Sequence, residues 1–104
     1  MEENKMTVAE KERTTMTKKE QCTVVAFQYG KEVFRCEFEE IATAKVKVNY
    51  LCKAAMKEKK NLMFSIYDKN ALEIANGDYW KGDNYYYYYD IRNDGFSREK
   101  IRIY

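Results

Sequence analysis

Apolar and charged residues alternate with a period of two between residues 32 and 40. Phe34, Cys36 and Phe38 share one parity, and charged residues stand between them. This period is typical of a β-strand with one buried face and one solvated face. We therefore expect a strand here, with Cys36 facing the core between the two phenylalanines.

The segment before it, residues 22–29, is rich in β-branched and aromatic residues and is followed by Gly30 and Lys31. Two strand-like segments separated by a short turn that contains glycine predict a β-hairpin. In the first strand of this hairpin we expect Val25 and Phe27 to face the core.

Between residues 41 and 60 the apolar residues recur at intervals of three and four, which is typical of an amphipathic helix. Lysines crowd the end of this segment, where a helix favours cations, and Asn61 is a suitable stop residue. The apolar stripe consists of Ile41, Ala44, Val48, Leu51, Cys52 and Ala55.

Alternation with a period of two returns after the helix and predicts four more strands. Turn-forming residues, such as those at 93–95, separate these strands. We expect Leu72 and Ile74 to face inward. The strands are expected over residues 61–68, 71–76, 85–92 and 96–104.

The predicted order of elements is β-β-α-β-β-β-β, which indicates a single α+β domain over residues 21–104. The apolar stripe of the helix needs cover on one side only. We therefore expect the helix to lie across one face of an antiparallel sheet of five to six strands.

Residues 1–20 form a charged N-terminal arm with five acidic and five basic residues. Thr7 and Thr17 each precede a glutamate with the spacing of a capping box, so a short helix over about residues 8–16 is one interpretation. A solvated, flexible arm is the other interpretation.

Residues 85–89 are five consecutive tyrosines. In a strand they point alternately to the two faces, so a core holds only about half of them. The odd-numbered tyrosines share a parity with the apolar Ile91, and we expect that set to face the core. The outer face is then expected to carry Tyr86 and Tyr88, with some of Arg98, Lys100, Arg102 and Tyr104.

An outer face of this composition has three interpretations. Tyrosine is a good strand former that tolerates partial exposure. Tyrosine, tryptophan and arginine are also the usual anchors of protein interfaces. Aromatic residues beside cations suit the stacking of single-stranded nucleic acid as well, although the chain has no aromatic RNA-recognition motif.

The predicted helix carries a second candidate surface, because residues 41–60 contain six lysines and one acidic residue, Glu58. Such a row contacts phosphate groups or an acidic protein, or it is an ordinary solvated helix face. The candidates for phosphate binding are Lys45, Lys53, Lys57, Lys60, Arg98 and Lys100.

The chain has no histidine, three widely spaced cysteines and four glycines, none of them in a phosphate-binding loop. The usual general base and the usual zinc ligand are therefore missing. The cysteines suit a reducing compartment, and no signal peptide or membrane span is visible. We expect a cytoplasmic protein that is not an enzyme, without a catalytic residue, metal site or cofactor.

These features favour a non-enzymatic module that binds a larger protein or a protein–nucleic acid complex. Its small size, richness in lysine and tyrosine, and lack of catalytic residues suggest an accessory protein of a phage or mobile element. In that form it would inhibit a host defence or nucleic-acid-handling complex by occlusion. The expected partner-binding residues are Tyr79, Trp80, Tyr86, Tyr88, Arg102 and Tyr104.

A small nucleic-acid-binding protein is the alternative, although a net charge of +2 is too small to argue for it. It would use the lysine-rich helix face and the tyrosine-rich sheet face. A homodimer through the C-terminal strand is compatible with either function, because no proline protects that edge.

Overall fold

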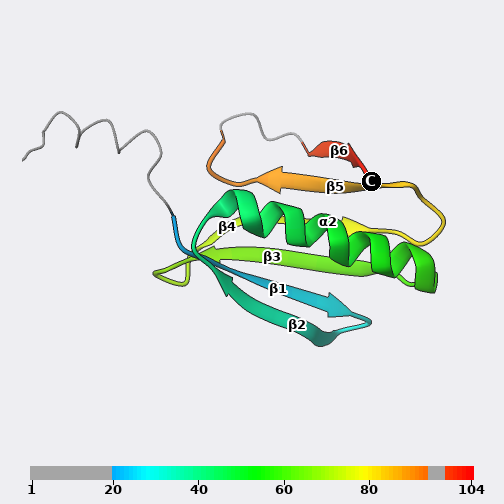
Figure 1. The fold of residues 1–104 in the computed structure, drawn as a ribbon, viewed down its shortest axis with the longest axis horizontal. Helices are drawn as coiled ribbons and strands as arrows, with labels where there is room; N and C mark the ends of the chain where they lie inside the picture. Colours follow the sequence, from blue (N-terminus) through cyan, green and yellow to red (C-terminus); the bar gives the residue numbers. More distant parts are fainter. Residues whose placement is uncertain (1–19, 94–97) are drawn as a thin grey trace, which may run out of the picture.

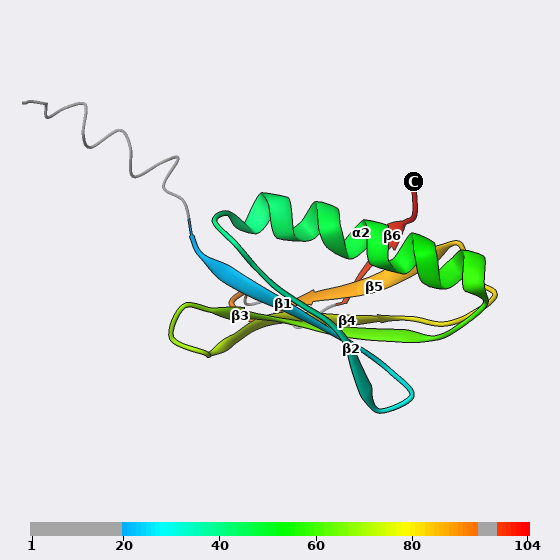
Figure 2. The ribbon, with the colours of Figure 1, turned by 60° about the horizontal axis from the view of Figure 1, so that its bottom comes forward.

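The computed structural model describes residues 20–93 and 98–104 (Figure 1). Six antiparallel strands form one sheet in the order β2-β1-β3-β4-β5-β6. Helix α2 lies across one face, and no other described element covers the opposite face (Figure 2). The predicted α+β class and order of elements are confirmed. The elements are β1 (Cys22–Gln28), β2 (Lys31–Phe38), α2 (Ile41–Glu58), β3 (Leu62–Asp68), β4 (Glu73–Tyr79), β5 (Tyr85–Asp90) and β6 (Glu99–Arg102).

Helix α2 packs on the sheet through small side chains. Its fully buried residues are Ala44, Val48, Cys52 and Ala55, all members of the predicted stripe. Ile41 and Leu51 are only partly buried at the margins of the contact. Small side chains let the helix approach the sheet closely, so the core between the two layers is dense.

The helix ends at Lys59, whose backbone adopts the left-handed conformation with φ 59°. This geometry lets the N–H of Lys60 donate to the carbonyl of Ala55 at 3.0 Å. The predicted stop at Asn61 is therefore wrong, because the chain has already left the helix. The side-chain oxygen of Asn61 instead accepts from the N–H of Lys81 at 2.8 Å.

Val25 and Phe27 are predicted to face the core; Val25 is buried as predicted, but both side chains lie on the sheet face opposite α2. Cys22, Val24 and Ala26 belong to the core cluster beneath α2, while Val25 is buried on the other face of the sheet. The first strand is apolar at both parities, so alternation alone does not select a face. The close helix selects the parity with the smaller side chains, because Phe27 would hold it away.

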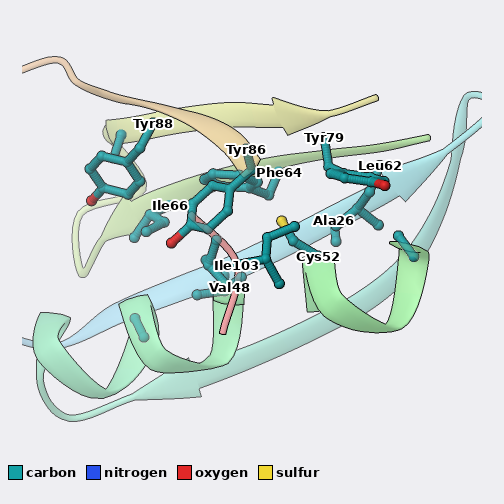
Figure 3. Packing of buried hydrophobic residues seen from close by; sticks show 14 of the residues in the cluster. Ala26, Val48, Cys52, Leu62, Phe64, Ile66, Tyr79, Tyr86, Tyr88 and Ile103 are labelled. Carbon is teal, nitrogen blue, oxygen red and sulfur yellow. The ribbon is translucent and has the colours of Figure 1, made fainter. Parts of the chain in front are cut away.

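The predicted faces of the tyrosine strand are also exchanged. Tyr86 and Tyr88 are each 4% exposed and point into the core (Figure 3). The ring of Phe64 contacts both, with centroids 6.1 Å apart in each pair. Tyr88 stands opposite Gly77, where the absence of a side chain makes room for Phe64. Ile91, which suggested the other face, lies beyond the end of β5 and is 37% exposed.

Two further apolar positions differ from the prediction. Leu72 is 63% exposed because it belongs to the turn before β4, where its N–H donates to the Asp68 carboxylate at 3.0 Å. Cys36 is exposed because β2 is an edge strand that curls away from α2 (Figure 2). Ile101 and Ile103 both pack against the core, as their shared parity predicts.

Two predictions fall wholly or partly outside the described residues. The charged arm lies there except for Glu20, whose carboxylate accepts from the Arg92 guanidinium at 2.5 Å. The turn predicted at 93–95 lies there from residue 94 onward.

Gly77→Ala is expected to lower the free energy of unfolding by about 2–3 kcal/mol, because it overpacks the core. A Cβ at this position would lie 2.5 Å from Cζ of Phe64 and would collide with the backbone oxygen of Tyr87. Urea denaturation measures the loss. Gly30→Ala is the control: nothing lies within 4 Å of its Cβ. Its left-handed backbone alone should contribute about 1 kcal/mol, and equal losses in the two variants would contradict the packing account.

Stability should fall in alkaline solution. Burial raises the pKa of Tyr86 and that of Tyr88 to about 12, whereas an ordinary phenol has a pKa of 10.0. The folded state therefore keeps protons that the unfolded state releases, so this stability is complete below pH 10 and is lost toward pH 12. Burial also raises the pKa of the Cys52 thiol to about 12, which adds to the same loss. Urea midpoints should fall over this range, and less steeply in Tyr88→Phe; an identical slope would refute the assignment.

Candidate functional site

The sheet face opposite α2, which we call the open face, is the candidate functional surface (Figure 2). Strand alternation and register decide which side chains point to it. The residues that point to it include Thr23, Val25, Phe27, Arg35, Met63, Ser65, Tyr67, Asn76, Asp78, Tyr85, Tyr87, Tyr89, Lys100 and Arg102.

Asp78 organises the centre of the open face. It is 8% exposed, and its two carboxylate oxygens have different partners. Trp80 donates its indole N–H to Oδ1 at 3.2 Å, and Arg98 donates from Nη1 to Oδ2 at 2.9 Å. One buried carboxylate thus orients an exposed indole and an exposed guanidinium.

A small apolar notch lies beside Trp80. Its volume is about 140 Å³, and Phe27, Tyr29 and Met63 line it together with the indole. Met63 is 55% exposed and Trp80 is 51% exposed, so both present large apolar surfaces to solvent. A notch of this kind suits one apolar side chain of a partner.

A larger hollow of about 410 Å³ lies on the same face over β1, β2 and β3. Val25 forms its floor and Arg35 and Tyr67 stand among its walls. Arg35 donates from Nε and Nη2 to the two carboxylate oxygens of Glu32, each at 2.9 Å, which lowers the pKa of Glu32. Phe27 lines both the hollow and the notch, so the two depressions adjoin along β1.

The odd-numbered tyrosines of β5 lie on the open face toward its β6 edge. The rings of Tyr85 and Tyr87 meet edge to face, 5.5 Å apart and at 81°. The Lys100 ammonium lies 4.3 Å above the centre of the Tyr85 ring, and Arg102 is the register partner of Tyr85. A hydrogen bond with Tyr87 is the main cause that raises the pKa of Tyr85.

The predicted partner-binding residues divide among three environments. Tyr79, Tyr86 and Tyr88 are buried in the core, where Tyr79 donates its hydroxyl to the Asp83 carbonyl at 2.7 Å. Trp80 and Arg102 are exposed on the open face. Tyr104 lies beside the helix instead, and it is 80% exposed.

The predicted phosphate-binding residues also separate onto different surfaces. Arg98 and Lys100 reach the open face. The ammonium of Lys45 lies 5.2 Å above the ring of Tyr88, on the helix side of the sheet. Lys53 and Lys57 belong to α2, and Lys60 follows its end. The fold therefore does not assemble the predicted set into one site.

Several open-face residues escaped sequence reasoning. The sequence predicts Phe27 in the core, and Met63 and Asp78 belong to no functional motif. Tyr87 was assigned to the wrong side with the other odd-numbered tyrosines. The alternation of residues 61–68 does place Met63 opposite the core parity, and this was the one available signal.

No group of three or more Asp, Glu or Cys side chains in residues 20–93 and 98–104 is arranged to hold a metal ion. Among the described helices, none has the length and apolar character needed to cross a membrane. Comparison of the chain with models of protein families, with curated proteins and with solved structures gave no match.

Asp78→Ala is expected to release Trp80 and Arg98 and to lower the free energy of unfolding by about 1–2 kcal/mol. Trp80 is the single tryptophan of the chain, so its fluorescence reports the change directly. Acrylamide quenching should increase and fluorescence anisotropy should fall. Asp83→Ala removes a carboxylate from the loop that follows β4 and should leave both signals unchanged; an equal response there would exclude the proposed orienting contact.

Proposed function

We propose that this chain is a non-enzymatic protein-binding domain that uses the open face of its sheet. The observation that carries the proposal is the apolar notch, in which exposed Trp80 and Met63 adjoin Phe27. A tryptophan held by a partly buried hydrogen bond is a pre-organised anchor, so less side-chain freedom is lost on binding.

The surroundings of the notch support a specific interface. The adjoining hollow adds a concave surface that Arg35 lines. Arg35 is paired with the carboxylate of Glu32, and Arg98 is paired with that of Asp78 elsewhere on the open face. An apolar centre with a polar, hydrogen-bonded rim is the usual anatomy of a protein interface. In its concrete form the domain binds stoichiometrically and occludes a surface of a larger partner, as an inhibitor of a host complex would.

Nucleic-acid binding is the second candidate, and the cluster of Tyr85, Lys100 and Arg102 favours it. Within the part of the chain that the structure describes, Lys100 and Arg102 form no ion pair, so they suit phosphate groups. Two contacts argue against stacking of a nucleic-acid base on Tyr85. Lys100 covers one face of Tyr85, and Tyr87 meets that ring edge to face.

Capture from a lysate of the cells in which the protein occurs tests the proposal, with the tagged chain as bait. A protein partner should be retained after nuclease treatment. Trp80→Ala and Met63→Ala should each weaken the purified complex by about tenfold or more, because anchor residues dominate such interfaces. Leu72→Ala removes an equally exposed apolar side chain at the turn before β4, and it should leave affinity unchanged.

Salt dependence separates the two candidates. The affinity for a protein anchored by the notch should change little between low and moderate salt, whereas phosphate binding should weaken steeply. Loss of capture on nuclease treatment, together with a steep salt dependence, would move the assignment to nucleic acid.

A further inference from the structure

We propose that the solvent face of α2 is a second docking surface, and that it binds an acidic amphipathic helix of a protein partner. This surface lies on the opposite side of the molecule from the open face (Figure 2). It therefore stands independently of the function proposed above.

The solvent face of α2 carries an apolar row of its own. Val46 is 55% exposed and Tyr50 is 59% exposed. Ala42, four residues before Val46, and Ala54, four residues after Tyr50, are also exposed. Residues four apart are neighbours on a helix surface, so the four form a continuous ridge. The residues that contact the sheet occupy the other side of the helix.

Lysines flank this ridge, and the one acidic residue of α2, Glu58, stands at its C-terminal end, four residues after Ala54. Lys53 and Lys57 project from the same side of α2, since they are three and seven residues from Tyr50. Lys45 lies at the margin nearer the sheet. Charge complementarity therefore calls for an acidic partner.

The C-terminal residue lies beside the helix. Asn49 donates its side-chain amide to the backbone oxygen of Tyr104 at 3.3 Å. This contact holds the end of the chain beside α2, where Figure 2 marks the C-terminus, and Tyr104 is 80% exposed.

The shape of this surface suits a helix as the binding partner. Alanines at both ends of the ridge permit close approach of another helix, whose own ridges would pack on either side of Val46 and Tyr50. Phosphate groups alone would bury none of the apolar row. An interfacial membrane helix normally presents large side chains such as Leu, Phe or Trp, and this ridge has two alanines, one valine and one tyrosine.

Two docking surfaces on opposite faces would let one small domain bridge two partners. The open face would hold the first partner through Trp80, and α2 would hold an acidic helix of the second. Substitutions on one face should then leave binding at the other face intact.

The test uses the full, isotope-labelled chain and follows its backbone amides by nuclear magnetic resonance. The probe is a synthetic amphipathic peptide with leucine at its a and d positions and glutamate at its solvent positions. A matched peptide with lysine in place of glutamate is the control. The acidic peptide should shift the amides of Val46, Tyr50, Lys53 and Lys57, and the basic peptide should shift none of them.

Variants make the result specific. Lys53→Glu combined with Lys57→Glu should weaken binding of the acidic peptide by about tenfold or more, because two attractive charges become repulsive. Tyr50→Ala should weaken it by about fivefold, whereas Leu72→Ala and Trp80→Ala should leave it unchanged. Circular dichroism confirms that each variant is folded.

Three outcomes would overturn the proposal. The acidic peptide shifts no amide of α2, or it shifts those of the open face instead. The basic peptide binds α2 equally well. A single-stranded oligonucleotide or phosphatidylserine vesicles displace the acidic peptide from α2 at lower concentration than unlabelled peptide does, which would reassign the surface to phosphate groups.

Discussion

The ring of Phe64 in β3 packs over Gly77 in β4 and touches Tyr86 and Tyr88 in β5. A side chain at position 77 would collide with this ring, so the contact requires glycine. Because Gly77 pairs with Tyr88, the same contact sets the register of β5. A slip of one residue would send every side chain of that strand to the other face.

The open face depends on that register. Asp78 follows Gly77 directly, so its carboxylate points away from α2 and reaches Trp80 and Arg98. Its partner across the strands is Tyr87, which also points to the open face. The packing of Phe64 in the core therefore decides which polar and aromatic groups the domain presents to solvent on the opposite side.

The two surfaces differ in chemistry because they arise in different ways. The open face is the uncovered side of a sheet, and its apolar notch is bordered by groups already held in hydrogen bonds. The solvent face of α2 consists of side chains on a single helix, with lysines around a low apolar ridge. Anchors held by hydrogen bonds suit recognition by shape, whereas lysines around an apolar ridge suit recognition by charge.

Element types and their order could be read from the sequence, because each depends on a local period. The helical spacing from Ile41 to Ala55 and the alternation around Phe64 reflect contacts within one element. The helix ends before the predicted Asn61 because Lys59 adopts a left-handed backbone, a conformation more usual for asparagine. Leu72 likewise lies in a turn, although its place in an alternating segment is typical of a strand residue.

What the sequence alone left open was the choice between two faces. In the run from Cys22 to Phe27 and in the tyrosine run, both parities are apolar or amphipathic, so local alternation is equally satisfied either way. The same ambiguity affected the candidate site, because the sequence identified its aromatic and basic residues but not the sheet face to which each side chain points. Only tertiary structure decided it: α2 accepts small side chains from β1, and Phe64 over Gly77 draws Tyr86 and Tyr88 inward.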